Sequence, residues 1–99
     1  MKPIVSKKIR QSARGQSCTL RSPHCNDNGE NVMLCHVPLP GMAGMGQKMS
    51  DIHGFYGCEG CHRYFDTEGR ADPERWQMAF RAVVETQNIL YELGLITVK

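Results

Sequence analysis

Four of the five cysteines in this 99-residue chain form two pairs whose spacings suit a metal ion. Six residues separate Cys18 from Cys25, and two separate Cys58 from Cys61. Two short loops that each offer a pair of thiolates make a tetrahedral zinc site. The alternative is reduced structural cysteines plus a separate C-x-x-C redox pair, and it is weaker because no thioredoxin-like βαβ pattern surrounds CEGC. We therefore predict a closed structural Zn²⁺ site, which stabilises the domain and does not catalyse.

Two histidines are candidates for catalysis. His36 lies in the apolar run VMLCHVPLP, which predicts a buried strand, and His62 follows Cys61 at the start of a predicted helical turn. If IHGFYG is a second strand and pairs with the first, and the turn packs across both, His36 and His62 face one groove. Such a ββα unit suits phosphodiester hydrolysis, in which the helix histidine holds a divalent ion and the strand histidine takes a proton from water. The alternative is that His36 is a packed core residue.

The neighbouring cysteine and histidines have other interpretations. Cys35 and His36 are adjacent on a strand, so their side chains point to opposite faces, and we interpret Cys35 as a small buried hydrophobic residue. His24 adjoins Cys25 in a turn and is interpreted as solvent-exposed, with an alternative role as a zinc ligand. His53 falls on the second candidate strand.

Local signals predict the elements that position these groups. Residues 1–16 form a basic lead-in with a short helical piece, and residues 17–47 contain turns, including Asn28-Gly29, and the first strand. A glycine- and methionine-rich loop, PGMAGMGQKMSD, leads to the second strand, and CHRYFDTEG starts a short helix. The tail LITVK is a short strand or an extended cover.

The last third predicts a helix over 73–93. Asp72-Pro73-Glu74 reads as an N-cap, a proline at the first helical position and an acid near the positive end of the helix dipole, and Gly94 ends the helix. At 1.5 Å per residue its length is roughly 30 Å. The hydropathy pattern assigns to the core a face with Trp76, Ala79, Phe80, Val83, Leu90 and Leu93. It assigns to solvent a face with Arg81, Glu85, Asn88 and Glu92.

Composition bounds the remaining properties. The length predicts one domain, 1–99, and no apolar run is long enough to span a membrane. Without a secretory signal pattern the protein is expected in the cytoplasm.

The formal net charge is +2, yet no acidic residue precedes Asp27. This basic segment is either a DNA-binding surface or a solvated, partly disordered tail, and its candidate nucleic-acid contacts are Lys7, Lys8, Arg10, Arg14 and Arg21.

The motifs SARGQSC, LCHV and CEGCH, in that order, resemble the HNH, or ββα-metal, endonucleases that carry a zinc cluster, and more narrowly the small prophage-encoded YbcO-like nuclease family. The resemblance covers roughly residues 10–96. It implies an α+β fold, in which the single domain 1–99 is a small zinc-stabilised ββα-metal (HNH-like) domain with its zinc-bound ββα region over 17–69 and a long C-terminal helix over 72–94. It also implies a metal-dependent DNA endonuclease, encoded by a phage or prophage of a bacterial host, with His36 as general base and His62 as ligand of the catalytic ion.

The chain departs from the HNH pattern at two positions. The middle asparagine of the name, which orients the base, has no exact counterpart; Asp51 and His53 are the nearest candidates and are also candidate metal ligands. Cys35 stands where many HNH enzymes carry a further ligand, and a thiol is a poor ligand for Mg²⁺. The catalytic ion therefore stays open among Mg²⁺, Mn²⁺, Ni²⁺ and Zn²⁺, as does the oligomeric state. The competing hypotheses are a zinc-stabilised nucleic-acid-binding module without catalysis and, with less support, an adaptor that uses the methionine loop.

Overall fold

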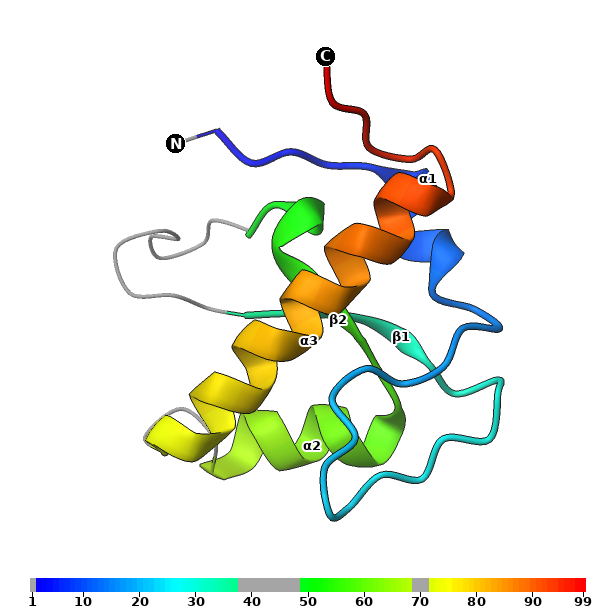
Figure 1. Cartoon of the computed structure of the whole chain (residues 1–99). Helices are drawn as coiled ribbons and strands as arrows, with labels where there is room; N and C mark the ends of the chain where they lie inside the picture. The colour runs from blue at the N-terminus through cyan, green and yellow to red at the C-terminus, as the bar shows by residue number, and fades with distance from the viewer. Residues whose placement is uncertain (1, 38–48, 69–71) are drawn as a thin grey trace.

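The computed structural model of the chain describes residues 2–37, 49–68 and 72–99. The elements follow in the order α1 (Lys7–Ser12), β1 (Met33–His36), the 3-10 helix η1 (Asp51–His53), β2 (Gly54–Gly57), α2 (Glu59–Glu68) and α3 (Pro73–Glu92). The two strands pair, α3 crosses in front of them in Figure 1, and α2 lies below the sheet in the same view. The structure is thus a small α+β domain with a two-stranded sheet and a long C-terminal helix.

The sheet is an antiparallel pair in which Met33 lies opposite Gly57 and His36 opposite Gly54. Both predicted strands are confirmed, although His53 lies in η1, just before β2, and not on the strand. Glycine is required at Gly57, because an added Cβ would lie 2.9 Å from Cys35 Sγ. This close approach lets the chain turn from β2 directly into α2, which completes a strand–strand–helix unit.

The core lies where β2 meets the helices. All four residues of β2 are buried, and α3 packs against this strand. Phe65 of α2 stands edge-on to Phe55 and to Trp76, with ring centroids 6.0 and 5.4 Å away. Aromatic pairs favour this geometry, so the three rings connect the sheet to both long helices.

Helix α3 begins and ends as predicted. The carboxylate of Asp72 accepts a hydrogen bond from the Glu74 N–H, Pro73 occupies the first helical position, and Gly94 has a φ of 75°. The left-handed conformation at Gly94 is the usual way in which a helix ends.

The predicted core face of α3 is wrong at two positions, because Phe80 is 74% exposed and Leu93 is 48% exposed. The residues buried on the helix are Ala79, Ala82, Thr86 and Leu90. These include small side chains that let α3 approach β2 closely, and Thr86 Oγ1 accepts a hydrogen bond from the Tyr56 N–H at 3.1 Å. A threonine with this partner can be buried at little cost, whereas a hydropathy pattern assigns it to the surface.

The basic lead-in is ordered, so the expectation of a partly disordered tail is wrong. The Ile4 N–H donates to the Ser50 hydroxyl, the Ile4 carbonyl accepts from the Asp51 N–H, and Ser6 caps α1 by accepting from the Ile9 N–H. Ile9 and Ala13 are buried in the main core. The N-terminal segment therefore belongs to the packed domain and brings its basic residues close to β1 and η1.

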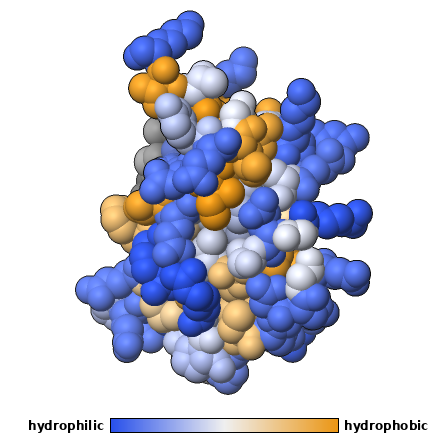
Figure 2. Space-filling view, turned by 45° about the vertical axis from the view of Figure 1, so that its right-hand side comes forward, coloured by the Kyte–Doolittle hydropathy of each residue, from blue (hydrophilic) through white to orange (hydrophobic). Residues whose placement is uncertain are grey.

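The C-terminal tail is not a strand: Leu95 and Ile96 pack against the core as a cover. Hydrophilic residues cover most of the face drawn in Figure 2, while hydrophobic residues gather in its upper part. Met49 is buried, and residues 40–48 of the predicted methionine loop, which spans 40–51, lie outside the described residues. None of the described helices combines the length and the hydropathy needed to cross a membrane.

Candidate functional site

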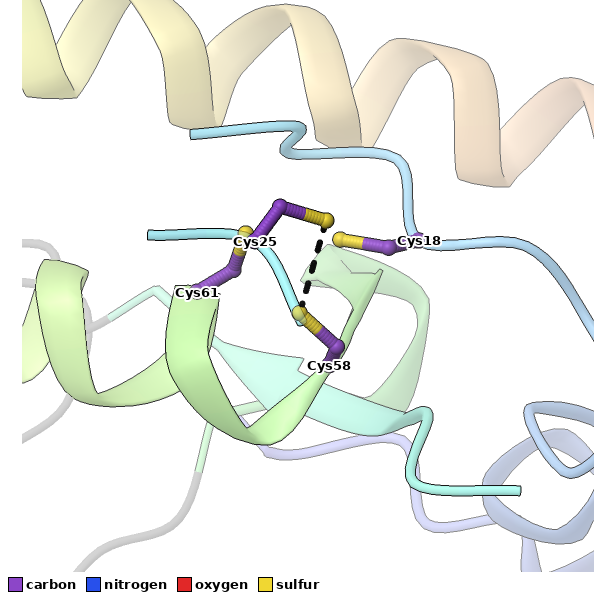
Figure 3. Close-up of side chains that lie close together, drawn as sticks. All are labelled: Cys18, Cys25, Cys58 and Cys61. Atoms are coloured by element: carbon purple, nitrogen blue, oxygen red, sulfur yellow. Dashed lines mark hydrogen bonds between the residues drawn. The ribbon is translucent and has the colours of Figure 1, made fainter. Parts of the chain in front are cut away.

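The two cysteine pairs converge in one cluster. Cys18 and Cys25 come from the loop between α1 and β1, whereas Cys58 and Cys61 come from the start of α2, and the four side chains point toward one another (Figure 3). Their sulfur atoms all lie within 4.8 Å of each other. Zn–S bonds of about 2.3 Å require sulfur atoms roughly 3.8 Å apart in a tetrahedron, so the donor set and its size fit a zinc ion. Among the described residues this is the one group of three or more ligand-type side chains close enough to hold a metal.

Backbone donors around the cluster stabilise sulfur in its thiolate form. The Ser22 N–H donates to Cys61 Sγ and the Asn26 N–H to Cys58 Sγ, each at 3.3 Å. Burial works to raise the pKa of Cys58, but the N–H groups of Cys61 and Asn26 outweigh it and bring that pKa to about 7. Burial raises the pKa of Cys61 and of Cys25, so Cys58 is the cysteine whose thiolate the hydrogen bonds favour, and a metal ion would displace the protons of Cys25 and Cys61 on binding.

His36 lies at the end of β1 against a buried carboxylate. Its Nε2 is 2.9 Å from Asp51 Oδ1, and the other oxygen, Oδ2, accepts from the Ser6 N–H at 2.6 Å and from Arg10 at 3.1 Å. The Asp51 side chain is only 4% exposed, whereas the His36 side chain is 36% exposed. His36, Asp51 and Arg10 line a cavity of about 520 Å³ together with Val5 and Met49. Asp51 therefore holds one ring nitrogen of His36, while the rest of the imidazole is partly open to solvent.

Asp51 carries its negative charge at neutral pH. Burial works to raise the pKa of this carboxyl, but the hydrogen bonds from the Ser6 N–H and His36, with the charge of Arg10, outweigh it and hold the pKa below its ordinary value. A carboxylate in this position accepts the Nε2–H of the imidazole, which leaves Nδ1 as the unprotonated nitrogen of neutral His36.

His62 pairs with a residue that the sequence interpretation did not consider. Its Nε2 lies 3.1 Å from Asp66 Oδ2, one helical turn further along α2, and both side chains are partly exposed. An imidazole and a carboxylate at this spacing are a common pair of ligands for divalent ions. The i,i+4 spacing on a predicted helix is the signal that would have revealed Asp66 from the sequence.

The remaining predicted site residues fall into three groups. Lys7, Lys8 and Arg14 are exposed on and just after α1, whereas Arg21 pairs with Glu85 at 2.8 Å. Cys35 is buried as interpreted, and burial raises its pKa to about 12. His24 is exposed, and His62 and His53 are not among the described residues that line the His36 cavity. The shared groove for His36 and His62 therefore stays a prediction.

Comparison with known proteins gives one consistent result. The family model described as "Putative nuclease YbcO" matches residues 7–95. Two relatives, "Putative nuclease YbcO" of Escherichia coli (strain K12) and "Putative nuclease ybcO" of Enterobacteria phage 82, are each 39% identical over 91 residues, or 89% of this chain and 95% of the relative. The solved "Structure of a putative bacteriophage protein from Escherichia coli str. K-12 substr. MG1655" matches with a TM-score of 0.67 and 28% identity, covering 88% of this chain and 100% of that one.

Proposed function

Because the chain belongs to the YbcO family, whose relatives carry the name "Putative nuclease", we propose that it is a metal-dependent endonuclease of the HNH type that hydrolyses phosphodiester bonds in DNA. The observation that carries this proposal is the hydrogen bond between His36 Nε2 and the buried Asp51 carboxylate at the edge of an open cavity. A histidine that only fills the core needs neither a charged partner nor solvent access, so this arrangement favours catalysis over packing.

His36 is the general base in this mechanism. Asp51 accepts the Nε2–H and holds the ring, so Nδ1 takes the proton from the attacking water as the water oxygen bonds to phosphorus. Asp51 is a positioning residue, because both of its oxygens are occupied by protein donors. Arg10, which is 44% exposed beside the same cavity, holds Asp51 and supplies positive charge for a phosphate.

His62 and Asp66 would hold the catalytic divalent ion through Nε2 and a carboxylate oxygen. When bound, such an ion neutralises charge on the scissile phosphate. The two side chains fit this role because they are partly exposed and supply only two ligands, which leaves positions for phosphate and water. A separate Zn²⁺ held by the four cysteines is structural, since four thiolates leave no open position. The exposed cations of α1 are the proposed DNA contacts outside the centre.

A zinc-stabilised nucleic-acid-binding module without catalysis is the second candidate. The observation that favours it is the ligand count, because no third His, Cys, Asp or Glu joins His62 and Asp66 within the part of the chain that the structure describes. In that case Asp51 and His36 only attach the N-terminal segment to the sheet. The module predicts salt-sensitive DNA binding that His36→Ala leaves unchanged per folded molecule.

Plasmid cleavage separates the two functions. The zinc-bound protein is incubated with supercoiled plasmid and Mg²⁺, Mn²⁺, Ni²⁺ or added Zn²⁺, and nicking is followed with time. We expect His36→Ala to lower the rate at least about 100-fold, the typical contribution of a general base, and His62→Ala and Asp66→Asn to raise the divalent-ion concentration needed. Zinc content and circular dichroism verify that each variant folds.

His53→Ala is the control variant, because His53 is the other histidine of this region and has no role in the proposed ligand pair. It should nick as fast as the parent, whereas a ligand set of His62 and His53 predicts a loss. No nicking with any of the four ions, or equal nicking by His36→Ala, would exclude the nuclease proposal.

A further inference from the structure

A second cavity lies on another face of α2, beside the cysteine cluster. It has a volume of about 330 Å³ and is lined mainly by polar and basic side chains: His24, Asn26, Arg63, Tyr64, Thr67 and Arg75. None of the described lining residues is acidic, and the volume falls in the range of small-ligand sites. The cavity takes no part in the proposed chemistry of His36, Asp51, His62 and Asp66.

The wall of this cavity is rigid. The Arg75 guanidinium lies 3.8 Å from the centroid of the Tyr64 ring, donates to the Tyr64 carbonyl at 2.8 Å and is 3.2 Å from Asp72. The His24 ring is 5.3 Å from the Tyr64 ring on a tilted plane. Arg75 and His24 thus order the tyrosine, and the cation is fixed in position before any ligand binds.

A second part of the wall belongs to the cysteine loops, and His24 contributes to both parts. The Gly60 N–H donates to Asn26 Oδ1 at 2.8 Å, and an added Cβ on Gly60 would clash with the His24 carbonyl oxygen. Gly60 lies between Cys58 and Cys61, and His24 precedes Cys25, so metal binding by the cysteines fixes both sides of this wall.

Arg63 is the cation of the cavity whose present ion pair a ligand can replace. It pairs with Glu59 at 2.9 Å, but the two side chains are 71% and 58% exposed. Exposed ion pairs contribute about 0–1 kcal/mol, so a phosphate in the cavity can replace Glu59 at little cost. An arginine binds a phosphate through two parallel N–H groups, which a flexible lysine cannot reproduce.

The position of the cavity on α2, relative to the proposed metal ligands His62 and Asp66, indicates its ligand. Arg63, Tyr64 and Thr67 lie on one face of the helix, and His62 with Asp66 lies about 130° around it at 100° per residue. A helix with side chains is about 10–12 Å wide, a width that a DNA strand covers within a few nucleotides.

We propose that the cavity lined by Arg63, Tyr64 and Arg75 binds the backbone phosphate of a DNA nucleotide a few positions from the scissile phosphate. This inference rests on the proposed function, because DNA is the ligand that reaches both faces of α2. The site holds the strand across the helix and reads the phosphodiester backbone, not the base sequence.

The test measures DNA binding in a His36→Ala background, so that cleavage does not interfere. Fluorescence anisotropy with a short labelled duplex is recorded at several salt concentrations for His36→Ala alone and with Arg63→Gln, Arg63→Lys or Lys99→Gln added. We expect Arg63→Gln to weaken binding about 10- to 100-fold, as for one charged hydrogen bond, and to reduce the slope of log affinity against log salt by about 0.9. Arg63→Lys should retain the slope but not the full affinity.

Lys99→Gln is the matched control, since it removes one exposed cation at the far end of the chain from α2 (Figure 1). Competition with inorganic phosphate and a mononucleotide distinguishes a strand from an isolated phosphate: only unlabelled DNA should compete at micromolar concentration. Arg63→Gln binding with parental affinity and slope, or no DNA binding at all, overturns the proposal. If Arg63→Gln loses affinity while the His36-containing parent nicks nothing, the contact stands and the nuclease function fails; if the parent nicks and Arg63→Gln binds normally, the reverse holds.

Discussion

A single buried carboxylate, Asp51, connects the proposed base to the N-terminal segment. One carboxylate oxygen is hydrogen-bonded to His36 Nε2, and the other accepts hydrogen bonds from the Ser6 N–H and from Arg10. A carboxylate removed from water is costly unless donors surround it, and these three donors satisfy that requirement. Because each of them holds the same group, the base cannot change orientation unless the lead-in also moves.

Asp51→Asn should therefore separate binding from catalysis. The amide is nearly the same size, but it lacks the negative charge and one of the two oxygen acceptors that hold His36 and the N-terminal segment in place. We expect kcat to fall about 10- to 100-fold, the loss typical of a residue that orients a functional group, with KM changed less than about twofold. Steady-state nicking rates at several DNA concentrations measure both constants. A rise in KM at constant kcat would mean that Asp51 only supports the DNA-binding surface.

Residue roles were predictable from the sequence where residue type and local spacing alone determine the role. The C-x6-C and C-x-x-C spacings identified the four cysteines that the structure brings together, and alternation along the strand identified Cys35 as buried. The pairing of His36 with Asp51 joins residues fifteen positions apart on two elements. No local pattern encodes such a contact, because it depends on the strand register and on the lead-in that closes over it.

At the scale of elements, α3 differs most between prediction and structure. Its limits follow from capping chemistry at Asp72 and Gly94, which acts within a few residues. Its buried face depends on the partner strand β2, against which α3 packs through Ala79, Ala82, Thr86 and Leu90. Hydropathy alone does not show where small residues are needed for close packing. The hydropathy pattern therefore assigned Phe80 to the buried face, although the structure exposes it.

Two phenylalanine variants test this orientation. Phe65→Ala should lower the free energy of unfolding by about 3–5 kcal/mol, because it removes a buried ring between Phe55 and Trp76 and leaves a cavity. Phe80→Ser on α3 should change it by less than about 0.5 kcal/mol, as for an exposed side chain. Urea unfolding of the zinc-bound proteins measures both values. A large cost for Phe80→Ser would mean that another surface covers it in solution.

At the scale of the whole molecule, the cysteine cluster joins the loop of the first cysteine pair to the start of α2. The loop has no helix or strand of its own, and the Thr19 N–H holds it to β2 by donating to the Tyr56 carbonyl at 2.7 Å. Its contacts with α2 include the His24 ring against Tyr64 and N–H groups that donate to cysteine sulfur atoms. A chain of this size buries only about 60–70% of its unfolded surface, so the core alone leaves little margin. We therefore expect metal binding to decide whether the loop and the start of α2 stay together.

Removal of the metal should unfold this part of the domain. We expect one zinc ion per chain, worth on the order of 10 kcal/mol of apparent folding free energy, and a chelator should abolish the cooperative thermal transition. Cys58→Ser should lose the zinc, whereas Cys35→Ala, which removes the fifth cysteine from the same core, should keep one equivalent and lose only about 1–2 kcal/mol. Metal analysis with thermal unfolding before and after chelation measures both. Full zinc content in Cys58→Ser, or an unchanged transition after chelation, would show that the cysteines do not hold a structural metal, and the cavity beside them would then lose its rigid wall.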